Sequence, residues 1–229
     1  MKLLLKIILV IAVIVVLVGG YLGFIPGVSG LFGSDQPRDL GATYTEADLA
    51  SGQAKLNQQL VDLNGRAARE VLTAALPVAS DARLTGKEFA AHLEAVHPIS
   101  NVQLIFNSDN TFEASGRIDK ERISAYAQLL GLTGDTEAQV MDAVNKYLPG
   151  SPVFYIKGTG KIINNEPTLS LTQAEVGRLP VPTDRAAEAL VAYAKLAEER
   201  VPGLKIDNFS IQDGQLVFKG TLPREFPKW

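Results

Sequence analysis

The chain has 229 residues, with 22 Lys and Arg against 25 Asp and Glu, two His and no Cys. This length accommodates one domain of roughly 150–200 residues and an appendage. The absence of cysteine excludes a disulfide scaffold, a thiol nucleophile and a thiolate metal site. Beyond Met1–Ile25, which holds two lysines and no acid, 20 basic and 25 acidic residues leave a net charge of −5. This balance argues against nucleic acid as the main partner.

The N-terminal segment is the most apolar part of the chain. Ile7–Ile25 is an uncharged run of about 19 residues, and a helix of that length spans roughly 30 Å, the thickness of a bilayer core. Lys2 and Lys6 precede the run, so the positive-inside rule places the N-terminus in the cytoplasm. Residues 1–25 are therefore predicted to form a cytoplasmic stub and a single-pass transmembrane anchor in the cell membrane. The alternative is a cleaved signal peptide, because Val28-Ser29-Gly30 offers small residues; either way, the rest of the chain lies outside the cytoplasm.

Composition divides the remainder into three parts. Residues 26–42 are rich in Gly, Pro, Ser and Asp, which is typical of a linker. Residues 43–222 are predicted to form one extracytoplasmic domain. Residues 223–229 form a C-terminal tail whose prolines exclude a regular helix. The lone Trp229 at its end is expected to dock on the domain, to lie in solvent, or to sit at a membrane interface.

Capping residues and helical spacing recur within the domain. Thr45–Asp48 and Thr85–Glu88 have the spacing of capping boxes. The second box opens a helix with Phe89, Leu93 and Val96 on one stripe, and Pro98 stops it. Thr183 is expected to cap a final amphipathic helix over residues 184–200. Other helices are predicted at residues 66–76, 120–130 and 136–147.

Three pairs of extended segments are each joined by residues typical of tight turns. The pairs are residues 101–106 with 111–118, 153–163 with 168–176, and 204–211 with 215–222. Hairpins are antiparallel, so about six strands predict an α+β fold in which an antiparallel, curved sheet packs against amphipathic helices.

Glycine interrupts the apolar face of one strand in each hairpin, at Gly116, Gly158 and Gly220. Glycine weakens a strand interior unless a bend, a bulge or a close approach requires it. One interpretation is a sheet that curves over a packed helix. The other is a curved sheet with room for an apolar ligand.

No motif indicates catalysis, a metal or a cofactor. His92 and His97, the two histidines, are five residues apart and do not share a helix face, and no cluster of Asp or Glu accompanies them. His92 is expected on the helix surface. A nucleophile elbow, a zinc-protease motif and a phosphate-binding loop are all missing. We therefore expect a protein that is not an enzyme, and an extracytoplasmic hydrolase is the weakest hypothesis.

Two strand ends carry a further resemblance. Gly116-Arg117-Ile118 ends one strand, and Gly177-Arg178-Leu179-Pro180-Val181-Pro182 leads from another strand into a helix. Together with a short N-terminal anchor and a capped helix, this pattern over residues 84–222 resembles the YpmS-like family of bacterial membrane-anchored proteins of unknown function. More remotely, it is similar to tubular lipid-binding domains. The resemblance implies holding or passing a lipid at the outer face of the membrane, and it implies no catalytic residues.

Two functions remain open from the sequence. The first is a non-enzymatic domain that binds a lipid or another amphiphile in an apolar groove between sheet and helix. The groove would be lined by eight apolar and aromatic residues: Phe106, Phe112, Phe154, Ile156, Leu169, Leu171, Leu190 and Tyr193. The same residues would also serve as ordinary core. The second function is a scaffold or interaction module in an envelope assembly, without a ligand, and a continuous apolar cavity would favour the first.

Overall fold

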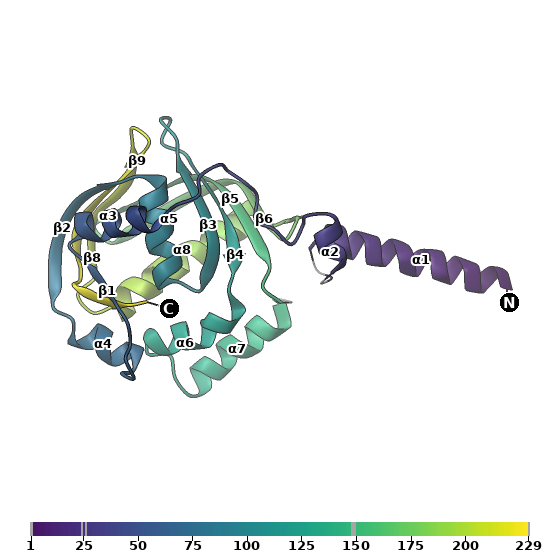
Figure 1. The fold of residues 1–229 in the computed structure, drawn as a ribbon, viewed down its shortest axis with the longest axis horizontal. Coiled ribbons are helices and arrows are strands. Elements are labelled where there is room, and N and C mark those ends of the chain that lie inside the picture. The colour runs from purple at the N-terminus through teal and green to yellow at the C-terminus, as the bar shows by residue number, and fades with distance from the viewer. Residues whose placement is uncertain (1, 24, 26, 148–149, 229) are drawn as a thin grey trace.

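The structure is a computed structural model that describes residues 2–23, 25, 27–147 and 150–228 (Figure 1). Its helices are α1 (Lys2–Tyr21), α2 (Val28–Leu31), α3 (Glu46–Leu56), α4 (Ala68–Ala74), α5 (Gly86–Val96), α6 (Lys120–Leu129), α7 (Asp135–Tyr147) and α8 (Thr183–Arg200). Its strands are β1 (Gln59–Val61), β2 (Pro77–Leu84), β3 (Ile99–Phe106), β4 (Phe112–Ile118), β5 (Val153–Ile163), β6 (Glu166–Val176), β7 (Leu179–Pro180), β8 (Lys205–Gln212), β9 (Gln215–Pro223) and β10 (Glu225–Pro227). The predicted α+β class is confirmed. Trp229 lies outside the described residues.

An eight-stranded antiparallel sheet forms the frame of the domain. Six strands follow the order β2-β9-β8-β5-β4-β3, while β6 pairs with β5 and β7. The long strand β5 pairs with β6 along one edge. Along its other edge, the first half of β5 pairs with β4 and the last residues pair with β8. The sheet therefore divides at β5 and curls, and Figure 1 shows its two wings on either side of α5 and α8.

Close backbone approaches at glycines produce this curl. A Cβ atom at Gly158 would lie 2.2 Å from the Ser170 carbonyl oxygen, and the β5–β6 register shifts between Lys157 and Gly158. A Cβ at Gly220 would lie 2.0 Å from the Lys205 carbonyl oxygen, beside the register shift in β8. Only glycine permits such contacts, and bulges increase the local bend and twist of a strand. The predicted curvature of the sheet is confirmed, and Gly158 and Gly220 lie beside its register shifts, whereas a Cβ at Gly116 would meet the Phe154 ring.

The prediction of six strands was incomplete. The three predicted hairpins are β3–β4, β5–β6 and β8–β9. The eight-stranded sheet also contains β2, which extends the β9 edge, and the two-residue β7. A separate parallel pair joins β1 to β10, so the last described residues form a strand with Phe226 buried. This pairing fixes the C-terminal segment onto the domain.

The helix predictions hold for α4 to α7, and both capping boxes are present with reciprocal bonds. In the second box, the buried Glu88 carboxylate also accepts a hydrogen bond from Lys55 Nζ at 2.6 Å, which ties α5 to α3. Helix α3 ends at Leu56, and its C-cap Asn57 has a left-handed conformation with φ of 55°. One detail differs from expectation. Helix α8 has Pro182 at its N-cap, so Thr183 is its first residue and not its cap.

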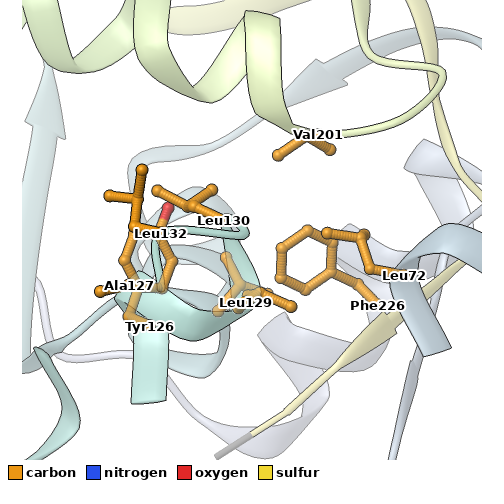
Figure 2. Packing of buried hydrophobic residues seen from close by; sticks show 9 residues of the cluster. Leu72, Tyr126, Ala127, Leu129, Leu130, Leu132, Val201 and Phe226 are labelled. Carbon is orange, nitrogen blue, oxygen red and sulfur yellow. The ribbon is translucent and has the colours of Figure 1, made fainter. Parts of the chain in front are cut away.

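Three apolar clusters fill the domain. One lies between β2, β9 and α3, and a second lies between α5 and the β3–β4 hairpin. The third joins α4, α6 and β10 beneath the C-terminal end of α8 (Figure 2). Its labelled members are Leu72, Tyr126, Ala127, Leu129, Leu130, Leu132, Val201 and Phe226. Figure 2 shows Val201 facing this cluster from the α8 side.

Arginines hold the segment between α1 and α3 against the β5–β6 region. Arg38 Nη2 donates to both carboxylate oxygens of Glu175, at 3.1 and 3.0 Å, and the guanidinium lies 3.9 Å from the centre of the Tyr155 ring. Arg117 donates to the Asp35 carbonyl, and Arg178 donates to the Gly33 carbonyl at 3.1 Å. The predicted linker therefore follows a defined path over the sheet and includes the single turn of α2.

Helix α1 projects away from the domain (Figure 1). Across the described chain, no helix combines the length and the apolar character that a membrane crossing requires. The predicted transmembrane span is thus not found among the described residues.

A candidate ligand site beneath helix α8

Helix α8 is amphipathic, yet none of its side chains is fully buried. It packs mainly against β6, on the concave side of the curled sheet. Leu190 and Tyr193, both on its apolar stripe, each expose 37% of their surface. An apolar stripe normally faces a close-packed core. Here part of the stripe, including Leu190 and Tyr193, borders cavities instead.

Two adjoining cavities occupy that space. The β5–β6 cavity has a volume of about 300 Å³, and among its lining residues are Phe106, Phe112 and Leu169 of the sheet and Leu190 of α8. The tyrosine cavity, named for Tyr126 and Tyr193 in its wall, has a volume of about 290 Å³. Both are walled by Phe89, Leu93, Ile162, Ala194 and Phe209. Together they have the size and apolar lining of a small-molecule site.

The structure brings most of the predicted groove residues to these cavities. Five line the β5–β6 cavity: Phe106, Phe112, Ile156, Leu169 and Leu190. Tyr193 lines the tyrosine cavity. The other two, Phe154 and Leu171, line neither. Leu171 is buried beside Gly158, and the Phe154 ring packs against Gly116. A role in binding stays a prediction for all eight.

A cluster of three hydrogen-bonding groups stands in the wall of the tyrosine cavity. His97 Nδ1 lies 3.0 Å from the Tyr126 hydroxyl and 2.7 Å from the Tyr193 hydroxyl, and the two hydroxyls are 2.6 Å apart. The residues come from the end of α5, from α6 and from α8. This cluster therefore fixes α8 over the cavity with polar bonds.

Burial keeps this wall uncharged at neutral pH. It lowers the pKa of His92 to about 4, and with the nearby His92 it lowers the pKa of His97 to about 3. Burial also raises the pKa of Tyr126 to about 12 and raises that of Tyr193 well above its ordinary value. The charged forms are disfavoured because the apolar surroundings cannot solvate them.

Two polar atoms around the same cavity have no hydrogen-bond partner among the described residues. They are His92 Nδ1 and Gln58 Oε1. The expectation that His92 lies on the helix surface is wrong, because its position on α5 turns it inward toward the cavity. Gln58 exposes 5% of its surface, and its Nε2 donates to the Pro223 carbonyl at 2.9 Å. Sequence reasoning missed Gln58 and Tyr126, since only the folded chain brings them to α8.

The described part of the chain holds no group of three or more His, Asp or Glu residues that could bind a metal ion. Comparisons with protein-family models, with curated proteins and with solved structures gave no match.

The lowered pKa values of the two half-buried histidines predict a loss of stability on mild acidification. Both pKa values lie below the ordinary 6.5, so the unfolded chain binds protons more readily as the pH falls below about 6.5. Unfolding should become easier by about 1 kcal/mol for each histidine at pH 5.5. Carboxylates such as Glu88 and Glu113, with pKa values below 4.5, act at lower pH. Urea titrations at pH 7.5, 6.5 and 5.5 measure the change.

A His92→Leu variant provides the control for this prediction. The chain has two histidines, so removing one should remove about half of the loss between pH 7.5 and 5.5. Equal stability of the native chain at both pH values would contradict the burial of these side chains.

Proposed function

We propose that this protein is a non-enzymatic domain that binds a lipid or another amphiphile between the curved sheet and α8. The observation that carries the proposal is the pair of adjoining apolar cavities, which share five lining residues. An acyl or prenyl chain gains about 0.8 kcal/mol for each methylene that it buries. The remote likeness to tubular lipid-binding domains, drawn from a helix and curved sheet on a single anchor, implies the same function.

A second feature supports action at a membrane. The α1 side chains from Val10 to Val18 include eight large apolar residues that are 43–61% exposed: Val10, Ile11, Val13, Ile14, Val15, Val16, Leu17 and Val18. Leu31 and Phe32, just beyond, are also exposed. An apolar surface of this extent marks a contact with a membrane or a protein. We propose that residues 7–25 attach the domain to a membrane, which raises the local concentration of lipid.

The test combines extraction with one pair of variants. The purified full chain should carry lipid that organic extraction and mass spectrometry detect, and it should enhance the fluorescence of N-phenyl-1-naphthylamine. Ala194→Phe should abolish the enhancement, because Ala194 lines both cavities. Ala192→Phe on the exposed side of the same helix is the matched control and should bind the probe normally.

Two outcomes would count against lipid binding. One is a chain that carries no lipid and does not bind the probe. The other is equal probe binding by the Ala194→Phe and Ala192→Phe variants, which would place the probe outside the cavities. Either result would favour the alternative function, an envelope scaffold that acts through its surface.

A further inference from the structure

The apolar surface of α1 extends all the way round the helix. Every residue from Val10 to Val18 is exposed, and this run makes more than two helical turns, so it faces every direction. A single docked protein surface covers only one face of such a helix, whereas lipid covers all of it at once. A helix that is apolar all round is typical of a core or of a membrane. The partner that fits this surface is therefore a lipid bilayer.

A second apolar patch lies at the base of α1, where the helix meets the domain (Figure 1). It consists of Tyr21, Leu31, Phe32 and Leu179, which expose between 44% and 82% of their surface. The rings of Tyr21 and Phe32 meet edge to face, with their centres 6.1 Å apart. These four residues, here named the interfacial patch, thus continue the apolar surface of α1 onto the domain.

Hydrogen bonds hold the end of α1 against the turn between β6 and β7. Ser34 Oγ donates to the Gly20 carbonyl at 2.6 Å. The backbone N–H of Arg178 donates to the Leu22 carbonyl at 3.2 Å, and Leu179 is the next residue. The direction of α1 relative to the domain is therefore fixed, and the interfacial patch is held at a defined place beside it.

Charged groups stand beside the interfacial patch and not within it. The Arg178 guanidinium donates to the Gly33 carbonyl at 3.1 Å, just after α2. On the other side of this segment, a Cβ atom at Gly30 would lie 3.4 Å from Asp35 Oδ2. Apolar and aromatic side chains with charged neighbours suit the boundary between headgroups and acyl chains. The patch therefore fits a shallow depth in a bilayer, and α1 fits a greater depth.

Resting on the proposed attachment through α1, we infer that the interfacial patch is a second, shallow membrane contact that fixes the orientation of the domain on the bilayer. Strand β7 leads through Val181 and Pro182 directly into α8, so this contact places the N-terminal end of α8 at the membrane surface. The other end of α8 bonds to α4, which lies on the side of the domain away from α1 (Figure 1). The helix that covers the cavities thus begins at the surface from which lipid comes.

Tryptophan fluorescence of full-length variants tests the inference. Replacing Trp229, the single tryptophan of the chain, by Phe gives a background without tryptophan. Leu31→Trp or Leu179→Trp then places one reporter in the interfacial patch. With phosphatidylcholine vesicles, both reporters should shift their emission to shorter wavelength. Bromine on the acyl chain near the headgroup should quench them more strongly than bromine at the end of the chain, and Ile14→Trp in α1 should show the reverse order.

Leu76→Trp in the same background is the matched control. Leu76 is 73% exposed and lies in the connection between α4 and β2, two elements on the side of the domain away from α1 (Figure 1). Its emission should not change with vesicles of either kind. Equal quenching at Leu76 and Leu31, or no quenching at Leu31 and Leu179 while the chain floats with the vesicles, would overturn the inference alone. A native chain that does not float would overturn the proposed attachment as well.

Discussion

Alanine at Gly158 or at Gly220 should destabilise the domain by about 3 kcal/mol or more, and each variant should unfold well below the native midpoint in urea. The added Cβ would lie 2.2 Å from the Ser170 carbonyl oxygen at the first site and 2.0 Å from the Lys205 carbonyl oxygen at the second. Both obstacles are backbone atoms of a paired strand, so relief requires the ladder itself to separate. The two changes act where the sheet bends.

Gly160→Ala is the matched control within β5. Its Cβ would meet the Leu169 Cδ1 atom at 3.0 Å, the end of a flexible side chain that lines the β5–β6 cavity. This variant should retain the native stability to within about 1 kcal/mol, since the leucine can rotate into the cavity. Similar unfolding midpoints for Gly158→Ala and Gly160→Ala would contradict the close approach at the bulge.

Arginine at both Val13 and Leu17 should release the protein from membranes. These residues are four apart on α1 and expose 50% and 47% of their surface. An arginine deep in a bilayer costs about 2.5–3.5 kcal/mol, so two should lower partitioning more than a hundredfold even at partial depth. Flotation of the full chain with phosphatidylcholine vesicles measures the bound fraction.

The control for this experiment is Val13→Leu with Leu17→Ile, which preserves the apolar surface and should float as the native chain does. The domain should fold equally in both variants, because α1 contributes no member to the three apolar clusters. If the arginine variant floats with vesicles like the native chain, attachment does not depend on α1.

Local signals in the sequence predicted the elements that have strong turns and caps. The hairpin β8–β9 is marked by Asp213-Gly214, both with positive φ, and α5 is marked by its capping box. The sequence pattern did not predict strand β2, because its inward residues include Ser80 and Ala82 and the alternation of apolar and polar side chains is weak there. It forms through pairing with β9, more than a hundred residues away, which no local pattern reports.

In the candidate site too, local sequence patterns predicted some features, and others depend on contacts between distant segments. Alternation along the strands and the stripe of α8 predicted the apolar wall, including Phe112, Ile156 and Leu190. Whether an apolar stripe meets a core or a cavity depends on the curl of the sheet, which follows from bulges between distant strands. The contacts of His97 with Tyr126 and Tyr193 depend on three elements meeting, so the polar wall was not predictable.

The shallow seating of α8 has a consequence for how a ligand reaches the interior. A helix without a fully buried side chain loses few buried apolar contacts when it moves away from the domain. Lifting it breaks the bonds of the Tyr193 hydroxyl, the exposed Lys195–Glu166 pair and the bond from Arg69 to the Arg200 carbonyl, while the strands keep their ladders. Local opening at α8 therefore requires much less free energy than global unfolding. Helix α8 covers the cavities, and its opening would also admit a ligand to them. The backbone amides of α8 should exchange with solvent deuterium long before those of β5 and β9.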